Sequence, residues 1–116
     1  MTTLYGIKNC DTVRKAMKWL EANHIEFTFH DFRTDGLTET KINSWLAELG
    51  NATVVNKRST TWKTLSEEQQ TQLIHGDAAP ILAEHPTLIK RPVLEYAQSV
   101  SVGFKDDMYQ SIIKSC

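Results

Sequence analysis

Hydrophobic and polar positions change period along this chain, and near the amino terminus they predict a strand, a helix and a second strand. Residues 3–7 have the apolar bulk of a short strand, and Ile25, Phe27 and Phe29 alternate with polar residues as in another. Between them, apolar residues recur every three or four positions, as on one face of a helix. These positions are Val13, Ala16, Met17 and Leu20. This βαβ order predicts two parallel strands.

The middle of the chain has helical patterns, and the last third returns to strands. A capping-box sequence at Ser66-Glu67-Glu68-Gln69 marks one helix start, and Asp106-Asp107 supplies the acidic residues typical of another. Residues 51–63 are the least regular part. The remaining expected elements are helices at 38–49 and 77–84 and an antiparallel hairpin with strands at 92–96 and 100–104.

This order of elements favours an α/β protein (α+β mixed) with a thioredoxin-like fold. We expect one four-stranded mixed sheet flanked by helices, with a helical insertion at about 37–86 between the βαβ and ββα halves. The length of 116 residues is typical of one domain, so we expect residues 1–116 to form a single domain and the protein to be a monomer.

Composition and charge then exclude several classes of partner. The net charge is −1, so no basic field attracts the chain to nucleic acid or to anionic lipid. No apolar run approaches the length of a membrane span, and the first residues lack the features of a signal peptide. We therefore expect a cytoplasmic protein that binds neither nucleic acid nor membrane.

Cys10 is the main candidate for chemistry, because it stands in the short loop between the first strand and the first helix. The helix start has amide hydrogens without intrahelical partners and a partial positive charge, which favour a thiolate, and Lys8 adds a formal charge nearby. A thiolate attacks disulfides and other oxidised groups. The alternative is that Cys10 is a small buried hydrophobic residue.

The other cysteine and the histidines do not suggest a metal site. The chain has two cysteines and four histidines, but no C-x-x-C pair and no spacing typical of zinc ligands. We expect no metal. Cys116 is the last residue, and we expect it to be a bystander thiol, with resolution of a mixed disulfide as the alternative.

A second candidate is the polar segment from Asn56 to Lys63. It brings Lys57, Arg58 and Lys63 together with several hydroxyl groups, a combination that binds anions. The alternative interpretation is a solvated loop.

Three motifs in order along the chain resemble the ArsC family, and more closely its YffB-type branch of arsenate-reductase-like proteins. The motifs are Tyr5-Gly6-Ile7-Lys8-Asn9-Cys10-Asp11-Thr12, Asn56-Lys57-Arg58-Ser59-Thr60-Thr61-Trp62 and Ile89-Lys90-Arg91-Pro92-Val93. The resemblance covers essentially the whole chain. It implies a thioredoxin-like fold with a helical insertion, in agreement with the order of elements.

The resemblance also implies roles for site residues. It makes Cys10 the nucleophile and places a cis peptide bond before Pro92, facing the cysteine. Arg91 then points its guanidinium at an anion or at glutathione, and Lys8 and Asn9 help to hold the anionic form. With Arg58, these residues form the predicted site for substrate and glutathione.

One difference from the family's arsenate reductases bears on the substrate. Those enzymes surround the anion with three arginines, of which Arg91 matches one. The first falls nearer Asn56, with Arg58 displaced by two positions, and the third falls near Phe104, beside Lys105. Each lost donor costs about 1.5–3 kcal/mol. We therefore expect a thiol reductase that uses glutathione as cosubstrate, rather than an efficient arsenate reductase.

In this hypothesis the Cys10 thiolate attacks a small oxidised thiol or an oxyanion. Glutathione then regenerates the Cys10 thiolate, and glutaredoxin is a further candidate partner. The alternative hypothesis is an Spx-like regulatory protein that binds RNA polymerase without turnover. Many proteins of that branch have a C-x-x-C pair, whose second position is Val13 in this chain. A third alternative is a domain that keeps the fold without activity.

Overall fold

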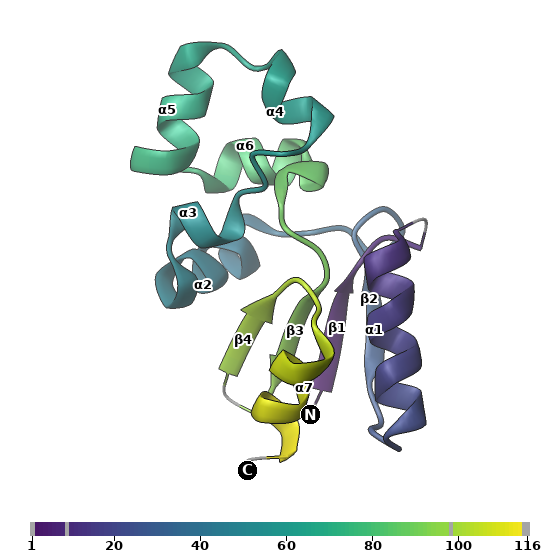
Figure 1. Ribbon diagram of the computed structural model, residues 1–116. Helices are drawn as coiled ribbons and strands as arrows, with labels where there is room; N and C mark the ends of the chain where they lie inside the picture. The colour runs from purple at the N-terminus through teal and green to yellow at the C-terminus, as the bar shows by residue number, and fades with distance from the viewer. Residues whose placement is uncertain (1, 9, 98, 115–116) are drawn as a thin grey trace. The chain divides into compact units, whose positions relative to one another are not determined.

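A four-stranded mixed sheet holds the first and last parts of the chain together (Figure 1). The computed structural model describes residues 2–8, 10–97 and 99–114, with Lys114 described by its backbone alone. The strands are β1 (Thr2–Gly6), β2 (Thr28–Asp31), β3 (Val93–Tyr96) and β4 (Ser99–Val102), in the order β2-β1-β3-β4. β1 runs parallel to β2 and antiparallel to β3, and β3 and β4 form the hairpin, which confirms the predicted pairing.

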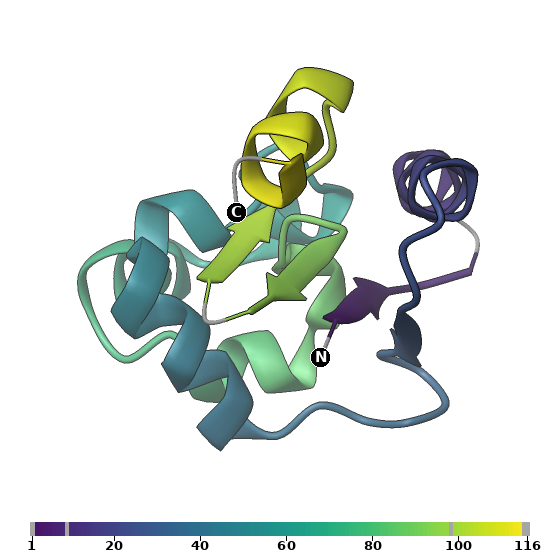
Figure 2. The same cartoon turned by 90° about the horizontal axis from the view of Figure 1, so that it is seen from below.

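Two helices cover one face of this sheet. Figure 2 shows α1 (Asp11–Ala22) and α7 (Asp106–Lys114) on the same side. Their buried side chains pack with Leu4 of β1 and Leu94 of β3 in one cluster. Tyr109 lies at the centre, with its ring edge-on to Trp19 and to Phe104 at centroid distances of 5.5 and 4.7 Å. The predicted four-stranded sheet with flanking helices, a thioredoxin-like fold, is confirmed.

The strand ends differ from the sequence prediction. β2 begins at Thr28 rather than Ile25, because the N–H of Ile25 donates to the carbonyl of Leu20 at 2.9 Å and continues the end of the helix. β4 ends at Val102 rather than Phe104, because Gly103 has a φ of 79° and turns the chain out of the strand. Of the predicted hairpin connection, Gln98 lies outside the described residues.

Leu37–Lys90 form a second compact unit, which is helical and corresponds closely to the predicted insertion. The predicted capping box is confirmed, because Ser66 and Gln69 form it, and the Thr38 side chain caps α2 by accepting from Lys41. The helix predicted from residue 77 begins at Ala79 instead, and its N-cap residue, Ala78, makes no side-chain capping bond. The three shortest helices, α3, α4 and η1, were not predicted. The helices are α2 (Glu39–Leu49), α3 (Asn51–Val54), α4 (Thr60–Thr64), α5 (Glu67–His75), α6 (Ala79–Glu84) and η1 (Pro86–Leu88).

The first unit comprises Met1–Gly36 and Arg91–Cys116, so the second is inserted between β2 and β3. The assignment of the whole chain to one domain stays a prediction.

Gly6, the last residue of β1, packs against Val13 in the first turn of α1. A Cβ atom added at Gly6 would lie 2.7 Å from Cγ2 of Val13, closer than two carbon atoms tolerate, and Val13 is fully buried. The absence of a side chain at Gly6 therefore lets the strand and the helix approach each other just before and just after the Cys10 loop.

We predict that Gly6→Ala destabilises the protein by about 1–3 kcal/mol, because the added methyl group overpacks the strand–helix contact. Urea unfolding measures this change. The Gly6→Ala, Val13→Ala double variant should be less destabilised than the sum of the single variants, because the second substitution removes the colliding methyl groups. Strict additivity would show that the Gly6–Val13 contact is not the cause.

A second prediction concerns the hydroxyl of Tyr109, which is buried and has no hydrogen-bond partner in the part of the chain that the structure describes. Tyr109→Phe should leave the free energy of unfolding unchanged or raise it by at most about 3 kcal/mol, because an unsatisfied polar group is removed.

Burial also raises the pKa of Tyr109 above its ordinary value of 10.0. The wild type should therefore lose stability above pH 10.0 relative to Tyr109→Phe, since only the unfolded tyrosine ionises readily there. Parallel stability–pH curves for the two proteins would contradict this.

Candidate functional site around Cys10

Cys10 is the N-cap residue of α1. Its backbone is extended, with φ −110° and ψ 120°, and its side chain makes no capping hydrogen bond. Its carbonyl accepts the N–H of Arg14 at 3.0 Å, as the first carbonyl of a helix does. The side chain is partly exposed and also packs against the buried cluster of the first unit. The thiol therefore lies at the positive end of the helix dipole and is not sealed in the core, as the nucleophile hypothesis requires.

Arg91 and Pro92 lie at the same end of the sheet as the Cys10 loop. Tyr5 of β1 pairs with Val93 at the start of β3, and the two strands are antiparallel. The chain therefore leaves β1 towards Cys10 at the end where Arg91 and Pro92 enter β3. The Arg91–Pro92 peptide bond is cis, as the family resemblance implied, and Pro92 is buried.

One nitrogen of the Arg91 guanidinium is buried without a partner. Nη1 is shielded from solvent and makes no hydrogen bond within the described residues. A guanidinium is always charged, so a buried donor of this kind costs free energy until an acceptor reaches it. A carboxylate or an oxyanion would supply that acceptor.

The structure also gives Arg14 a role that the sequence analysis missed. Lys8 is exposed, and its carbonyl accepts a hydrogen bond from Nε of Arg14 at 3.1 Å. Arg14 lies off the apolar stripe of this helix, and that position alone indicates only a side chain that faces solvent. Asn9, the other residue predicted to hold the anion, lies outside the described residues, as does Cys116.

Arg58 belongs to the second unit. It is exposed, and its N–H donates to Oδ1 of Asn56 at 3.1 Å, which closes the turn before α4 (Thr60–Thr64). This helix occupies part of the segment that was expected to be irregular, so the basic residues there stand on an ordered turn and helix. The assignment of Arg58 to the site of Cys10 stays a prediction.

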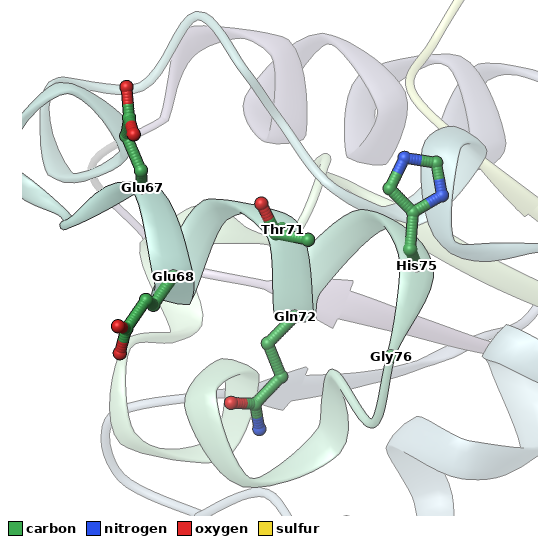
Figure 3. Close-up of a pocket in the computed structure, with 6 residues that line it drawn as sticks. All are labelled: Glu67, Glu68, Thr71, Gln72, His75 and Gly76. Atoms are coloured by element: carbon green, nitrogen blue, oxygen red, sulfur yellow. The ribbon is translucent and has the colours of Figure 1, made fainter.

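A pocket on α5 is a different feature (Figure 3). It belongs to the second unit and contains none of the predicted site residues. In the close-up, the side chains of Glu67 and His75 leave the helix on one side, and those of Glu68 and Gln72 point away from them. Because these polar groups do not converge on one point, the pocket lacks the arrangement that orients a small ligand.

The described part of the chain contains neither a cluster of metal ligands nor a membrane-spanning helix. Within residues 2–8, 10–97 and 99–114, no three side chains of His, Cys, Asp or Glu gather where a metal ion could be held. Nor does this part of the chain contain a helix long and apolar enough to cross a membrane.

Comparisons with known proteins agree with the motifs. The model of the ArsC family matches residues 5–112. The solved structure of the YFFB protein has a TM-score of 0.89 at 40% sequence identity and covers 96% of this chain and 97% of that chain. An arsenate reductase (ArsC) related protein from Brucella melitensis has a TM-score of 0.75 at 36% identity, covering 97% of this chain and 94% of that chain.

Other relatives include a protein with a regulatory name. Global transcriptional regulator Spx 2 of Bacillus anthracis is 28% identical over 109 residues, which span 92% of this chain and 82% of the regulator. An uncharacterized protein of Haemophilus influenzae is 46% identical over 111 residues, 96% of this chain and 97% of its own length. The family match over residues 5–112, the sheet order and the cis bond before Pro92 agree, and this chain belongs to the ArsC family as an arsenate-reductase-related protein.

Proposed function

We propose that this protein is a glutathione-dependent thiol reductase in which Cys10 is the nucleophile. The observation that carries the proposal is Nη1 of Arg91, which is buried and has no partner among the described residues, together with the position of Arg91 at the end of the sheet where the Cys10 loop begins. A thiol on a helix N-terminus and a guanidinium in need of an acceptor suit a small ligand that has both a sulfur atom and a carboxylate.

Glutathione meets both requirements. It is a tripeptide thiol with two carboxylates, so one carboxylate can accept from Nη1 of Arg91 while the sulfur approaches Cys10. A hydrogen bond to a charged group contributes about 1.5–3 kcal/mol, and the buried donor is otherwise unsatisfied. Lys8 and Asn9 stay predicted members of the same site.

The reaction follows from the chemistry of one thiolate. The Cys10 thiolate attacks a sulfur of a disulfide formed by glutathione and a second thiol, and the second thiol leaves as a thiolate that takes up a proton. Cys10 then forms a mixed disulfide with glutathione. The thiolate of another glutathione attacks this bond, which releases oxidised glutathione and restores the Cys10 thiolate. The net reaction consumes one glutathione thiol, which joins the glutathione half of the substrate to form oxidised glutathione, and it releases the second thiol in reduced form.

The surroundings of Cys10 support an external thiol as the second attacking group. Val13, three residues after Cys10, occupies the second position of a C-x-x-C pair and is fully buried. The first turn of α1 therefore supplies no second sulfur. Glutaredoxin is a further candidate partner, and a cytoplasmic, monomeric protein stays our expectation.

Thiol reduction fits this site better than efficient arsenate reduction. Arg58 is exposed on the second unit, and Lys105 stands beside Phe104, where the third family arginine falls; it too is exposed. Arg91 alone matches the arginines that surround the oxyanion in the family's arsenate reductases. We therefore expect arsenate to be a poor substrate and small oxidised thiols to be good substrates.

We predict that the purified protein reduces a mixed disulfide of glutathione and 2-mercaptoethanol, with glutathione as the reductant. The formation of oxidised glutathione can be followed with glutathione reductase and NADPH. Cys10→Ser should abolish turnover, because a hydroxyl is not ionised at neutral pH, whereas Cys116→Ser should retain it. An inactive wild type that specifically recovers RNA polymerase from cell extract would instead favour the regulatory alternative, which the Spx similarity supports.

A further prediction separates a binding role of Arg91 from a structural one. Arg91→Met keeps the apolar stem but removes the charge, so binding of S-methylglutathione measured by calorimetry should weaken about 10- to 150-fold. The free energy of unfolding of the ligand-free protein should stay the same or rise, because a buried unpaired donor is lost. Arg33→Ala, at an exposed arginine of the same unit, is the control and should change neither quantity. Lost stability with intact binding would assign Arg91 to the fold alone.

A further inference from the structure

We propose that Arg14 is a positioning residue for Cys10, whose guanidinium fixes the exposed part of the loop before the cysteine against the first turn of α1. The inference deepens the proposed function and rests on it, because the position of the sulfur matters for catalysis when Cys10 is the nucleophile.

The side chain of Arg14 contacts the chain on both sides of Cys10. Its Nε donates to the carbonyl of Lys8, two residues before the cysteine, at 3.1 Å. Its Nη1 lies 3.5 Å from Oδ1 of Asp11, the residue after the cysteine. The main-chain N–H of Arg14 also donates to the carbonyl of Cys10 at 3.0 Å. Arg14 thus contacts Lys8, Cys10 and Asp11, which lie before, at and after the thiol.

The shape of the guanidinium is what allows this arrangement. A planar group with donors in fixed directions can face two acceptors at once, whereas the ammonium of lysine is a point charge on a flexible stem. The ion pair itself contributes little, because the Arg14 and Asp11 side chains are 54% and 88% exposed. The hydrogen bond to the Lys8 carbonyl is therefore the part of the contact that fixes the geometry.

Among the described residues, other contacts hold this loop at its start, through Gly6 and Ile7, and at its end, where the Cys10 side chain packs against the buried cluster. The carbonyl of Gly6 accepts the N–H of Phe32 at 2.9 Å, and Ile7 is buried. Lys8 is exposed, and the side chain of Cys10 makes no capping bond that would hold it in place. The bond from Arg14 thus restrains Lys8, which the packing of Gly6 and Ile7 leaves exposed to solvent.

This restraint bears directly on the proposed reaction. Attack on a disulfide requires the sulfur to approach along the axis of the bond that breaks, so the rate depends on how narrowly the nucleophile is oriented. Without the Arg14 side chain the loop can adopt more conformations, and fewer of them align the sulfur with a bound disulfide.

The experiment measures single-turnover attack of Cys10 on oxidised glutathione, by mass spectrometry of the glutathione adduct, in a Cys116→Ala background so that one thiol reacts. Arg14→Ala and Arg14→Lys should both slow adduct formation, by about five- to tenfold, because neither keeps the double contact. Lys15→Ala removes a neighbouring exposed charge of α1 and should stay within about twofold of the parent, since the Arg14 hydrogen bond is intact.

The comparison of these variants decides between geometry and charge. A parent-like rate for Arg14→Lys, or an equal loss in Lys15→Ala, would overturn the positioning role in favour of a simple effect of positive charge. Thermal unfolding checks that each variant is folded, and Arg14→Lys keeps the test valid if Arg14→Ala is unstable. Failure of the positioning role can be told apart from a failure of the proposed function. If the proposed function is wrong, the parent protein shows no turnover with glutathione, but the rates of adduct formation in the Arg14 and Lys15 variants can still be compared with that of the parent.

Discussion

The contact between Gly6 and Val13 determines where the candidate nucleophile stands. β1 pairs with both β2 and β3, so its position is fixed by hydrogen bonds on either side. The missing side chain of Gly6 lets α1 approach the end of this strand, and the buried Val13 fills the space. Cys10, three residues before Val13, thereby becomes the N-cap residue of α1. Packing, rather than a capping side chain, puts the thiol beside the free amide groups.

The strand register brings a distant part of the chain to the same place. Because β1 and β3 are antiparallel, the residues that follow β1 and those that precede β3 lie at one end of the sheet. Arg91 and Pro92 thereby reach the neighbourhood of the Cys10 loop although the whole second unit separates them in sequence. A change in the pairing of the two strands would separate the guanidinium from the cysteine without altering either residue.

Features with a local cause were predictable from the sequence. The position of Cys10 before a helix, the capping box at Ser66 and the acidic start of α7 all depend on neighbouring residues, and the structure contains each of them. α3 and α4 were missed because they are four and five residues long, too short for a hydrophobic period to appear.

The contacts of the candidate site depend on the fold and were less predictable. The pattern of α1 placed Arg14 on the solvent side, but it could not show that a long side chain turns back to a carbonyl of the preceding loop. Burial of Nη1 of Arg91 likewise depends on packing that no local pattern reports. The motif resemblance supplied the cis bond before Pro92, for which the residues alone gave no reason.

The burial of Val13 has a kinetic consequence. A sulfur adduct on Cys10 finds no thiol one turn further along α1, because that position is filled by a fully buried valine in contact with Gly6. A paired thiol in the same helix would act at a high effective concentration fixed by geometry, whereas a separate molecule must arrive by collision. An adduct that only an external thiol resolves has a lifetime that varies inversely with the concentration of that thiol around the protein.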